Sequence, residues 1–169
     1  GVAGKPLDAT FDEQAQHDVA TALKTVVSTG AKEVLWVGHS KGGLVAYAHL
    51  AKNPAAPIKA IVAMGTPVRF GQHRAVQAFL EIFEPALSLG VIPLRLPARA
   101  FAPIGLPPGP FGPYLANAAN MDPHIVRQAI FNVSSDILGG VARQFRRWLR
   151  NDAFDADDGF DYRAGMKAI

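Results

Sequence analysis

The chain has 169 residues, enough for one ordinary domain and its core, and its formal net charge is +3. Only 18% of the residues are charged, below the ~25% typical of soluble domains, so much of the chain is expected to be buried. The lysines and arginines are dispersed apart from one cluster, which argues against a nucleic-acid partner, and the absence of cysteine excludes disulfides, thiolate metal sites and a cysteine nucleophile.

No apolar run reaches ~18 residues, so no membrane-spanning helix is expected. The chain begins at a glycine and carries no recognisable signal peptide. The sequence therefore assigns no compartment, and both a cytoplasmic and a secreted location stay open.

The first predicted element is a helix that begins near Thr10 and stops at Gly30. Thr10-Phe11-Asp12-Glu13 has the residue types of a capping box, in which the threonine caps the helix and the glutamate reaches back. Apolar residues then recur at helical spacing, at positions 11, 15, 19, 22, 23, 26 and 27.

The next stretch joins an apolar strand to an uncharged helix through a glycine-flanked serine. The strand is predicted over about residues 33–38, and the helix from Gly42 to about Asn53. The connecting residues are Gly38, His39, Ser40, Lys41, Gly42 and Gly43. A serine on such a sharp strand-to-helix turn is typical of a nucleophile elbow. The alternative is a glycine-rich turn with a capping serine.

Each residue type in this pattern has an expected task. Because Gly38 and Gly42 lack a Cβ, strand and helix can approach closely, and Ser40 can hold a strained backbone conformation with its hydroxyl exposed. The backbone N–H of Lys41 would lie at the helix N-terminus, where orphan donors and the helix dipole favour a developing oxyanion. The Lys41 side chain is expected to point to solvent.

A second apolar strand is predicted over residues 58–64, and Gly65-Thr66-Pro67 follows it. With the intervening helix, this strand would complete a right-handed βαβ crossover. It is continuously apolar apart from Lys59, as expected for a parallel strand that is covered on both faces.

The chain resembles the α/β-hydrolase superfamily in its esterase and lipase branch. The residues that carry this resemblance are Gly38–Gly43, the apolar helix that follows them, and Ile58–Pro67. The resemblance covers residues 1–70 well and the remainder loosely. It implies an α/β fold, namely a partial α/β-hydrolase fold with two parallel strands around the elbow and a largely helical cap or lid. The domains would be 1–68 for the core, 69–150 for the cap, and 151–169 for the lead-in to a further core strand.

The cap would hold a helix over residues 72–84 and a proline-rich stretch over 93–113. With few backbone donors, the proline-rich stretch is expected to build neither a regular helix nor a central strand. Its place favours a lid over a plain surface loop.

Asp122 and Pro123 predict the start of a helix, and Asp136 is expected to cap the next one. Arginines 143–150 and aspartates 152–161 are expected to offset each other.

The catalytic partners of Ser40 are not recognisable. A serine hydroxyl needs a general base and the base needs an acid, which follow the nucleophile in this superfamily. The downstream histidines are His49, His73 and His124, and none fits the expected position. We therefore expect the chain to be a fragment truncated at both ends, catalytically incompetent alone, with the acid and base outside it.

The leading function is a serine hydrolase of carboxylic esters that acts through an acyl-enzyme on Ser40. Its substrate would be a small-molecule or lipid ester, with transient contact to a lipid interface, and neither a metal nor an organic cofactor is implied. The alternatives are an acyltransferase or thioesterase, in which only the acceptor differs, and a non-catalytic homologue that uses its cavity or cap for binding.

Overall fold

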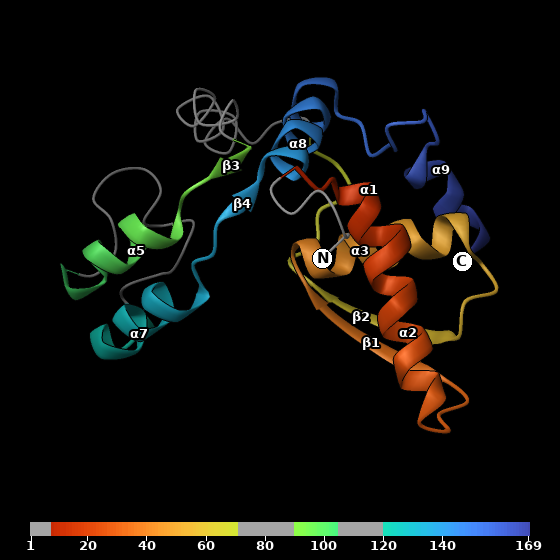
Figure 1. Cartoon of the computed structure of the whole chain (residues 1–169), viewed down its shortest axis with the longest axis horizontal. Coiled ribbons are helices and arrows are strands. Elements are labelled where there is room, and N and C mark those ends of the chain that lie inside the picture. The colour runs from red at the N-terminus through yellow and green to blue at the C-terminus, as the bar shows by residue number, and fades with distance from the viewer. Residues whose placement is uncertain (1–7, 71–89, 105–119) are drawn as a thin grey trace.

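The computed structural model describes residues 8–70, 90–104 and 120–169, which form a mixed arrangement of helices and two small sheets (Figure 1). The helix expected over 72–84 and the proline-rich residues 105–113 lie outside the described residues. The described elements are α1 (Phe11–Glu13), the π-helix η1 (Gln14–Asp18), α2 (Val19–Ser28), β1 (Val34–His39), α3 (Lys41–Lys52), β2 (Ile58–Met64), β3 (Val91–Ile92), α5 (Arg95–Phe101), the 3₁₀-helix η3 (Ala102–Ile104), α7 (Pro123–Val133), β4 (Ile137–Leu138), α8 (Gly139–Asn151), α9 (Tyr162–Gly165) and the 3₁₀-helix η5 (Met166–Ala168).

The first predicted helix is present, and both of its end signals are confirmed. The Glu13 N–H donates to Thr10 Oγ1 at 3.1 Å, and the Thr10 N–H donates to Glu13 Oε2 at 2.8 Å, which completes the capping box. Gly30 has a φ of 96°, the left-handed conformation that favours glycine after a helix. The apolar pattern did not indicate that the second segment, η1, is a π-helix.

The main sheet pairs β1 with β2 in parallel, in a register that places Leu35 beside Ala60 and His39 beside Met64. Both strands match the predicted ones to within a residue. α3 joins them and packs on the sheet face that carries Trp36. The opposite face was expected to be covered, but it exposes four large apolar side chains in the described part of the chain, namely Leu35, Val37, Val62 and Met64.

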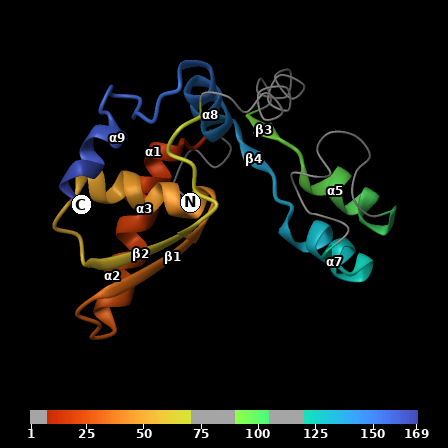
Figure 2. The same cartoon turned by 180° about the vertical axis from the view of Figure 1, so that it is seen from behind.

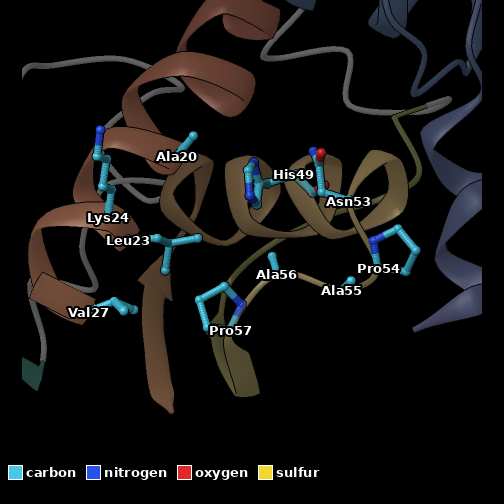
Figure 3. A pocket seen from close by; sticks show the side chains of 10 residues that line it. All are labelled: Ala20, Leu23, Lys24, Val27, His49, Asn53, Pro54, Ala55, Ala56 and Pro57. Carbon is cyan, nitrogen blue, oxygen red and sulfur yellow. The ribbon is translucent and has the colours of Figure 1, made fainter. Parts of the chain in front are cut away.

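The loop from α3 to β2 closes a hollow against α2 (Figure 3). The hollow has a volume of about 530 Å³. Its walls are mostly apolar, with Leu23 and Val27 from α2 and Pro54 and Pro57 from the loop, and His49 of α3 forms part of its lining.

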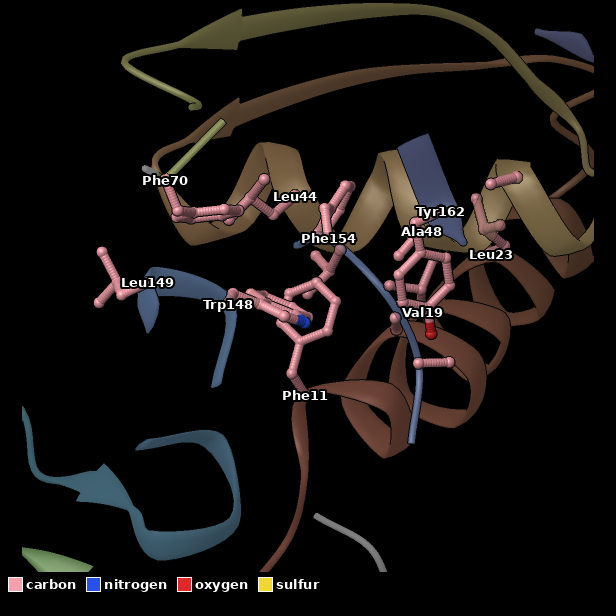
Figure 4. Packing of buried hydrophobic residues seen from close by; sticks show 14 residues of the cluster. Phe11, Val19, Leu23, Leu44, Ala48, Phe70, Trp148, Leu149, Phe154 and Tyr162 are labelled. Atoms are coloured by element: carbon pink, nitrogen blue, oxygen red, sulfur yellow. The ribbon is translucent and has the colours of Figure 1, made fainter. Parts of the chain in front are cut away.

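The core lies on the side of α3 away from the sheet, where aromatic rings from distant parts of the chain meet (Figure 4). Phe11 is fully buried and packs edge-on against Trp148 of α8, with ring centroids 4.8 Å apart. Phe154 and Tyr162, from the segment after α8, complete this aromatic cluster. Leu44 and Ala48 of α3 form its other side. Trp148 belongs to this core although the cap was expected to run to residue 150, and the division into domains stays a prediction.

Asp12 holds these segments together by hydrogen bonds beside the aromatic cluster. Its carboxylate accepts from Gln144 Nε2 at 2.6 Å, from the Tyr162 hydroxyl at 2.8 Å and from the Asp157 N–H at 2.7 Å. Burial, and then the hydrogen bond to Asp12 and the charge of that carboxylate, raise the pKa of Tyr162, so its hydroxyl stays a proton donor. Three donors from residues 144–162 therefore share one acceptor near the start of the chain.

The cap region, which comprises β3, α5, η3, α7 and β4, projects away from the main sheet and its helices (Figures 1 and 2). Its two short strands pair antiparallel, and α5 packs against α7. The expectation that the proline-rich stretch builds no regular helix is wrong for residues 95–101. Pro97 is the third residue of α5, where the backbone N–H would have no intrahelical acceptor, so the proline removes no helical bond.

The two aspartates expected to cap helices behave differently. Asp122 caps α7 as predicted, since its side chain accepts from the His124 and Ile125 N–H groups. The expectation for Asp136 is wrong, because α8 begins after Leu138 and has no side-chain cap. The Asp136 carboxylate instead accepts from the N–H of Arg95, the first residue of α5, at 2.8 Å. It caps a helix that lies before it in the chain.

The acidic segment after α8 offsets part of the positive charge of that helix, as predicted, through Arg147. Arg147 forms ion pairs with Asp155, at 2.9 Å, and with Asp157. Lys52 of α3 reaches Asp158 at 2.7 Å. These contacts fold the segment back on α8 and α3 and place α9 against α3.

Replacing Phe11 by alanine should lower the free energy of unfolding by about 3–5 kcal/mol, because it removes the ring at the centre of the core and leaves a cavity. Phe101→Ala is the matched control, since Phe101 on α5 is 56% exposed, and it should change stability by less than about 0.5 kcal/mol. Urea denaturation followed by circular dichroism measures both. Equal losses in the two variants would contradict this description of the core.

Candidate active site

Ser40 is the single residue between β1 and α3, and its backbone is strained. Its φ is 50° and its ψ is −119°. Among the described residues other than glycine, only Ser40 and Asp152 have a positive φ. Such a conformation is sparsely populated and persists only where the surroundings impose it.

Hydrogen bonds from both sides hold this turn. The Ser40 N–H donates to the Met64 carbonyl at the end of β2, at 2.9 Å. The Ser40 carbonyl accepts from the N–H groups of Gly43, at 3.0 Å, and Leu44, at 3.3 Å. From the strand side, Trp36 Nε1 donates to the Gly42 carbonyl at 2.9 Å. The serine backbone is thus tied to both strands and to the helix that follows it.

The three glycines of the turn differ in the space that surrounds them. A Cβ on Gly38 would lie 2.5 Å from the Gly42 carbonyl carbon and from the Gly43 nitrogen, so β1 and α3 come together at Gly38 as predicted. For Gly42 the predicted steric reason is wrong, because no described atom beyond its chain neighbours and the backbone of its own helix lies within 4 Å of an added Cβ. The second close approach is at Gly43, where a Cβ would lie 2.3 Å from Thr66 Oγ1.

Lys41 is the first residue of α3, as expected for the donor of an oxyanion hole. Its side chain is exposed, as expected, and its Nζ also donates to Gln14 Oε1 at 2.8 Å. Partial desolvation lowers the pKa of Lys41, and the negative charge of Asp18 opposes that shift. The ammonium therefore lies along η1, on the α1–α2 side of the turn.

The six residues of the motif all lie together where β1 ends and α3 begins, at the carboxyl end of the parallel sheet. Ser40 and His39 are both exposed there. The His39 ring lies next to Gly65 after β2, since a Cβ on Gly65 would be 3.7 Å from His39 Nε2. Ligands of parallel α/β sheets bind at this end of the strands.

The histidines of the described residues do not form a hydrogen bond with the Ser40 hydroxyl. His49 is buried on α3, and its Nδ1 lies 2.9 Å from the Ala15 carbonyl, so Nδ1 carries the proton. His124 pairs with Gln128 on α7, and His73 lies outside the described residues. No general base or acid is therefore assigned to the candidate site within this part of the chain.

The hollow of Figure 3 is not the substrate site of Ser40. Pro57, which lines it, accepts from the Val34 N–H at the amino end of β1. The six residues of β1 separate that point from Ser40, a length of about 20 Å. The hollow and the serine thus lie at opposite ends of the sheet.

Two further features bear on what the chain could bind. Across residues 8–70, 90–104 and 120–169, no group of three or more His, Asp or Glu side chains is placed to hold a metal ion. In the same residues, no helix is long and apolar enough to cross a bilayer.

Sequence reasoning did not identify Thr66 as part of this turn. Its hydroxyl donates toward the Ser40 carbonyl at 3.1 Å, across 26 positions of the chain. Gly65-Thr66-Pro67 indicated only the end of a strand, and no local pattern pairs a threonine with a serine so far away.

Comparison with known proteins gives one local similarity. No protein-family model matches the chain. A lipase of Caenorhabditis elegans, named lipase lipl-5, is 30% identical over 83 residues, which are 48% of this chain and 21% of that lipase. The match therefore spans about a fifth of the lipase, and it indicates a distant lipase-like relationship over about half of this chain.

Gly38→Ala should lower the free energy of unfolding by at least about 1–3 kcal/mol, because the new methyl group meets backbone atoms that have no room to move. Gly42→Ala is the matched control, and it should leave stability unchanged or raise it by up to about 1 kcal/mol, since alanine favours a helix more than glycine does. Thermal and urea denaturation measure both variants. A tolerated alanine at 38 would contradict the close approach of β1 and α3.

The stability of the fold should fall as the pH drops below 6.5. Burial lowers the pKa of His49 below its ordinary value of 6.5, so the unfolded chain binds a proton that the folded chain does not. The contribution of His49 is therefore fully present above pH 6.5 and is lost as the pH falls below that value. His49→Gln should show a smaller drop in urea denaturation, whereas His124→Gln, at an exposed site, should keep the wild-type drop. An equal drop in both variants would rule out His49 as the cause.

Proposed function

We propose that Ser40 is the nucleophile of a serine hydrolase that cleaves carboxylic esters through an acyl-enzyme. The observation that carries this proposal is the backbone of Ser40, with φ 50° and ψ −119°, on a one-residue turn between a parallel strand and a helix. That is the context that distinguishes a nucleophile elbow from a chance Gly-x-Ser-x-Gly. The local similarity to a lipase supports the same reaction class.

In this reaction the Ser40 oxygen attacks the ester carbonyl carbon while the hydroxyl proton passes to a general base. The tetrahedral intermediate collapses, the C–O bond to the alcohol breaks, and the alcohol leaves with that proton. Water then attacks the acyl-enzyme, releases the carboxylic acid and returns the hydrogen to Ser40. The exposed position of Ser40 suits an attacking group, and its base and acid are not assigned.

The Lys41 N–H would stabilise the oxyanion. It is the first donor of α3, where helical N–H groups have no intrahelical acceptor and the helix dipole favours negative charge. In the described part of the chain, the Lys41 N–H donates to no backbone carbonyl. It is thus free to donate to a substrate oxygen, and removing one such donor typically slows catalysis about 100- to 1,000-fold.

The cap region supports an apolar ester as the substrate. It exposes five large apolar side chains in the described residues, namely Leu96, Phe101, Ile104, Ile125 and Phe131. Leu96 is 78% exposed and Ile104 75%, which suits transient contact with acyl chains or a lipid interface better than contact with water alone. The cap would then act as a lid.

The test uses the full product of the reading frame that contains this chain. A fluorophosphonate probe should modify Ser40, as mass spectrometry of the labelled peptide would show, and p-nitrophenyl esters should be hydrolysed. Ser40→Ala should abolish labelling and lower kcat by at least about 1,000-fold. Ser135→Ala, at an exposed serine after α7, is the matched control and should retain both activities. The 169-residue chain alone should label far more slowly, because none of its described histidines contacts Ser40.

Three outcomes would count against the proposal. Labelling at a serine other than Ser40, or hydrolysis that survives Ser40→Ala, would assign the chemistry elsewhere. Labelling at Ser40 with acyl transfer and no hydrolysis would indicate an acyltransferase. The absence of both labelling and turnover in the full product would favour a binding protein.

A further inference from the structure

Thr66 stands two residues after β2, and its side chain faces the turn that carries Ser40. Thr66 Oγ1 lies 3.1 Å from the Ser40 carbonyl oxygen and 3.3 Å from the Met64 carbonyl oxygen. Both partners are acceptors, so the threonine hydroxyl is the donor, and its single proton lies between two carbonyls. One of these belongs to the serine turn and the other to the end of the neighbouring strand.

We propose that Thr66 is a positioning residue of the candidate site, which fixes the backbone of Ser40 and thereby the direction of its hydroxyl. This inference rests on the proposed function of Ser40. Thr66 would not touch the substrate, because its hydroxyl is turned toward backbone carbonyls. Its effect on the reaction passes through Ser40.

The strained backbone conformation of Ser40 has to be held in place, and the Thr66 hydrogen bond can do this. A positive φ at a residue with a side chain relaxes unless its neighbours hold it. The bonds from the Gly43 and Leu44 N–H groups to the Ser40 carbonyl come from the same helix and would move with the turn. The Thr66 hydroxyl comes from the β2 side, and so does the Met64 carbonyl that accepts the Ser40 N–H. Together they attach both peptide groups of Ser40 to the sheet.

Packing at Gly43 supports the same role. A Cβ on Gly43 would lie 2.3 Å from Thr66 Oγ1 and 2.8 Å from Thr66 Cγ2. The threonine therefore occupies the space that a side chain at 43 would need, and it seals the first turn of α3 against the chain after β2. The glycine at 43 is explained by Thr66, which links two motifs that are separate in the sequence.

The experiment compares Thr66→Val, which keeps the shape and removes the hydroxyl, with Thr66→Ser, which keeps the hydroxyl. In the full product of the reading frame, Thr66→Val should slow fluorophosphonate labelling of Ser40 and lower kcat for a p-nitrophenyl ester by about 10- to 100-fold, because small misplacements of a nucleophile are that costly. The KM should change by less than about twofold, since Thr66 makes no substrate contact. Thr66→Ser should retain most of the wild-type rate.

A second measurement does not depend on activity. In the 169-residue chain, amide hydrogen exchange at Ser40 should be at least about tenfold faster in Thr66→Val than in wild type or Thr66→Ser, because the turn opens more often. Exchange at Val126, whose N–H bonds to Asp122 on α7, should stay unchanged. Unchanged exchange at Ser40 in Thr66→Val would overturn the positioning role. An equal loss of labelling rate and kcat in the valine and serine variants would also overturn it, because the effect would then come from the packing of the side chain and not from its hydroxyl. If Ser40 of the wild type is not labelled but the exchange rates are as expected, the proposed function is contradicted and the positioning role of Thr66 is not.

Discussion

The backbone of β1 meets the first turn of α3 at Gly38 so closely that no side chain fits between them. This contact sets the direction in which the chain leaves β1. A single residue then has to turn the chain from the strand into the helix. Ser40 is that residue, and its positive φ is the local consequence. The same contact brings α3 against the sheet, so that the helix separates the sheet from the aromatic core (Figure 4).

The framework around α3 is built from segments that are far apart in the chain. The start of the chain supplies Phe11 and Asp12, and its far end supplies Trp148, Phe154 and Tyr162. Their rings pack against one another, and the polar atoms of Asp12, Trp148 and Tyr162 are hydrogen-bonded, so the helix that follows Ser40 lies against a buried core. The cap region differs, because it is small and exposes much of its apolar surface.

The departures from expectation have two causes, one local and one tertiary. The proline-rich stretch was expected to form no helix, but at the third position of α5 the missing N–H of Pro97 has no acceptor to lose. Asp136 was read as a cap for the helix that follows it, and it caps a helix 41 positions earlier. Gly42 was read as sterically required, whereas Gly43 is the residue that Thr66 crowds. For Asp136 and for the glycines of the turn, the residue type was informative, and the contact that it makes depended on which segments meet in space.

The sequence by itself determined the elements whose signals are local. The capping box at Thr10, the two parallel strands, the serine turn and the helix start at Asp122 follow from short-range hydrogen bonding and from periodic burial, which neighbouring residues encode. Tertiary structure alone decided the contacts between distant segments. These include the Thr66 hydroxyl on the Ser40 carbonyl, the fold-back of Lys41 onto Gln14, the three donors on Asp12, and the sheet face left open by the described helices. Such contacts arise from the packing of surfaces that are remote in sequence, and no window of neighbouring residues contains both partners.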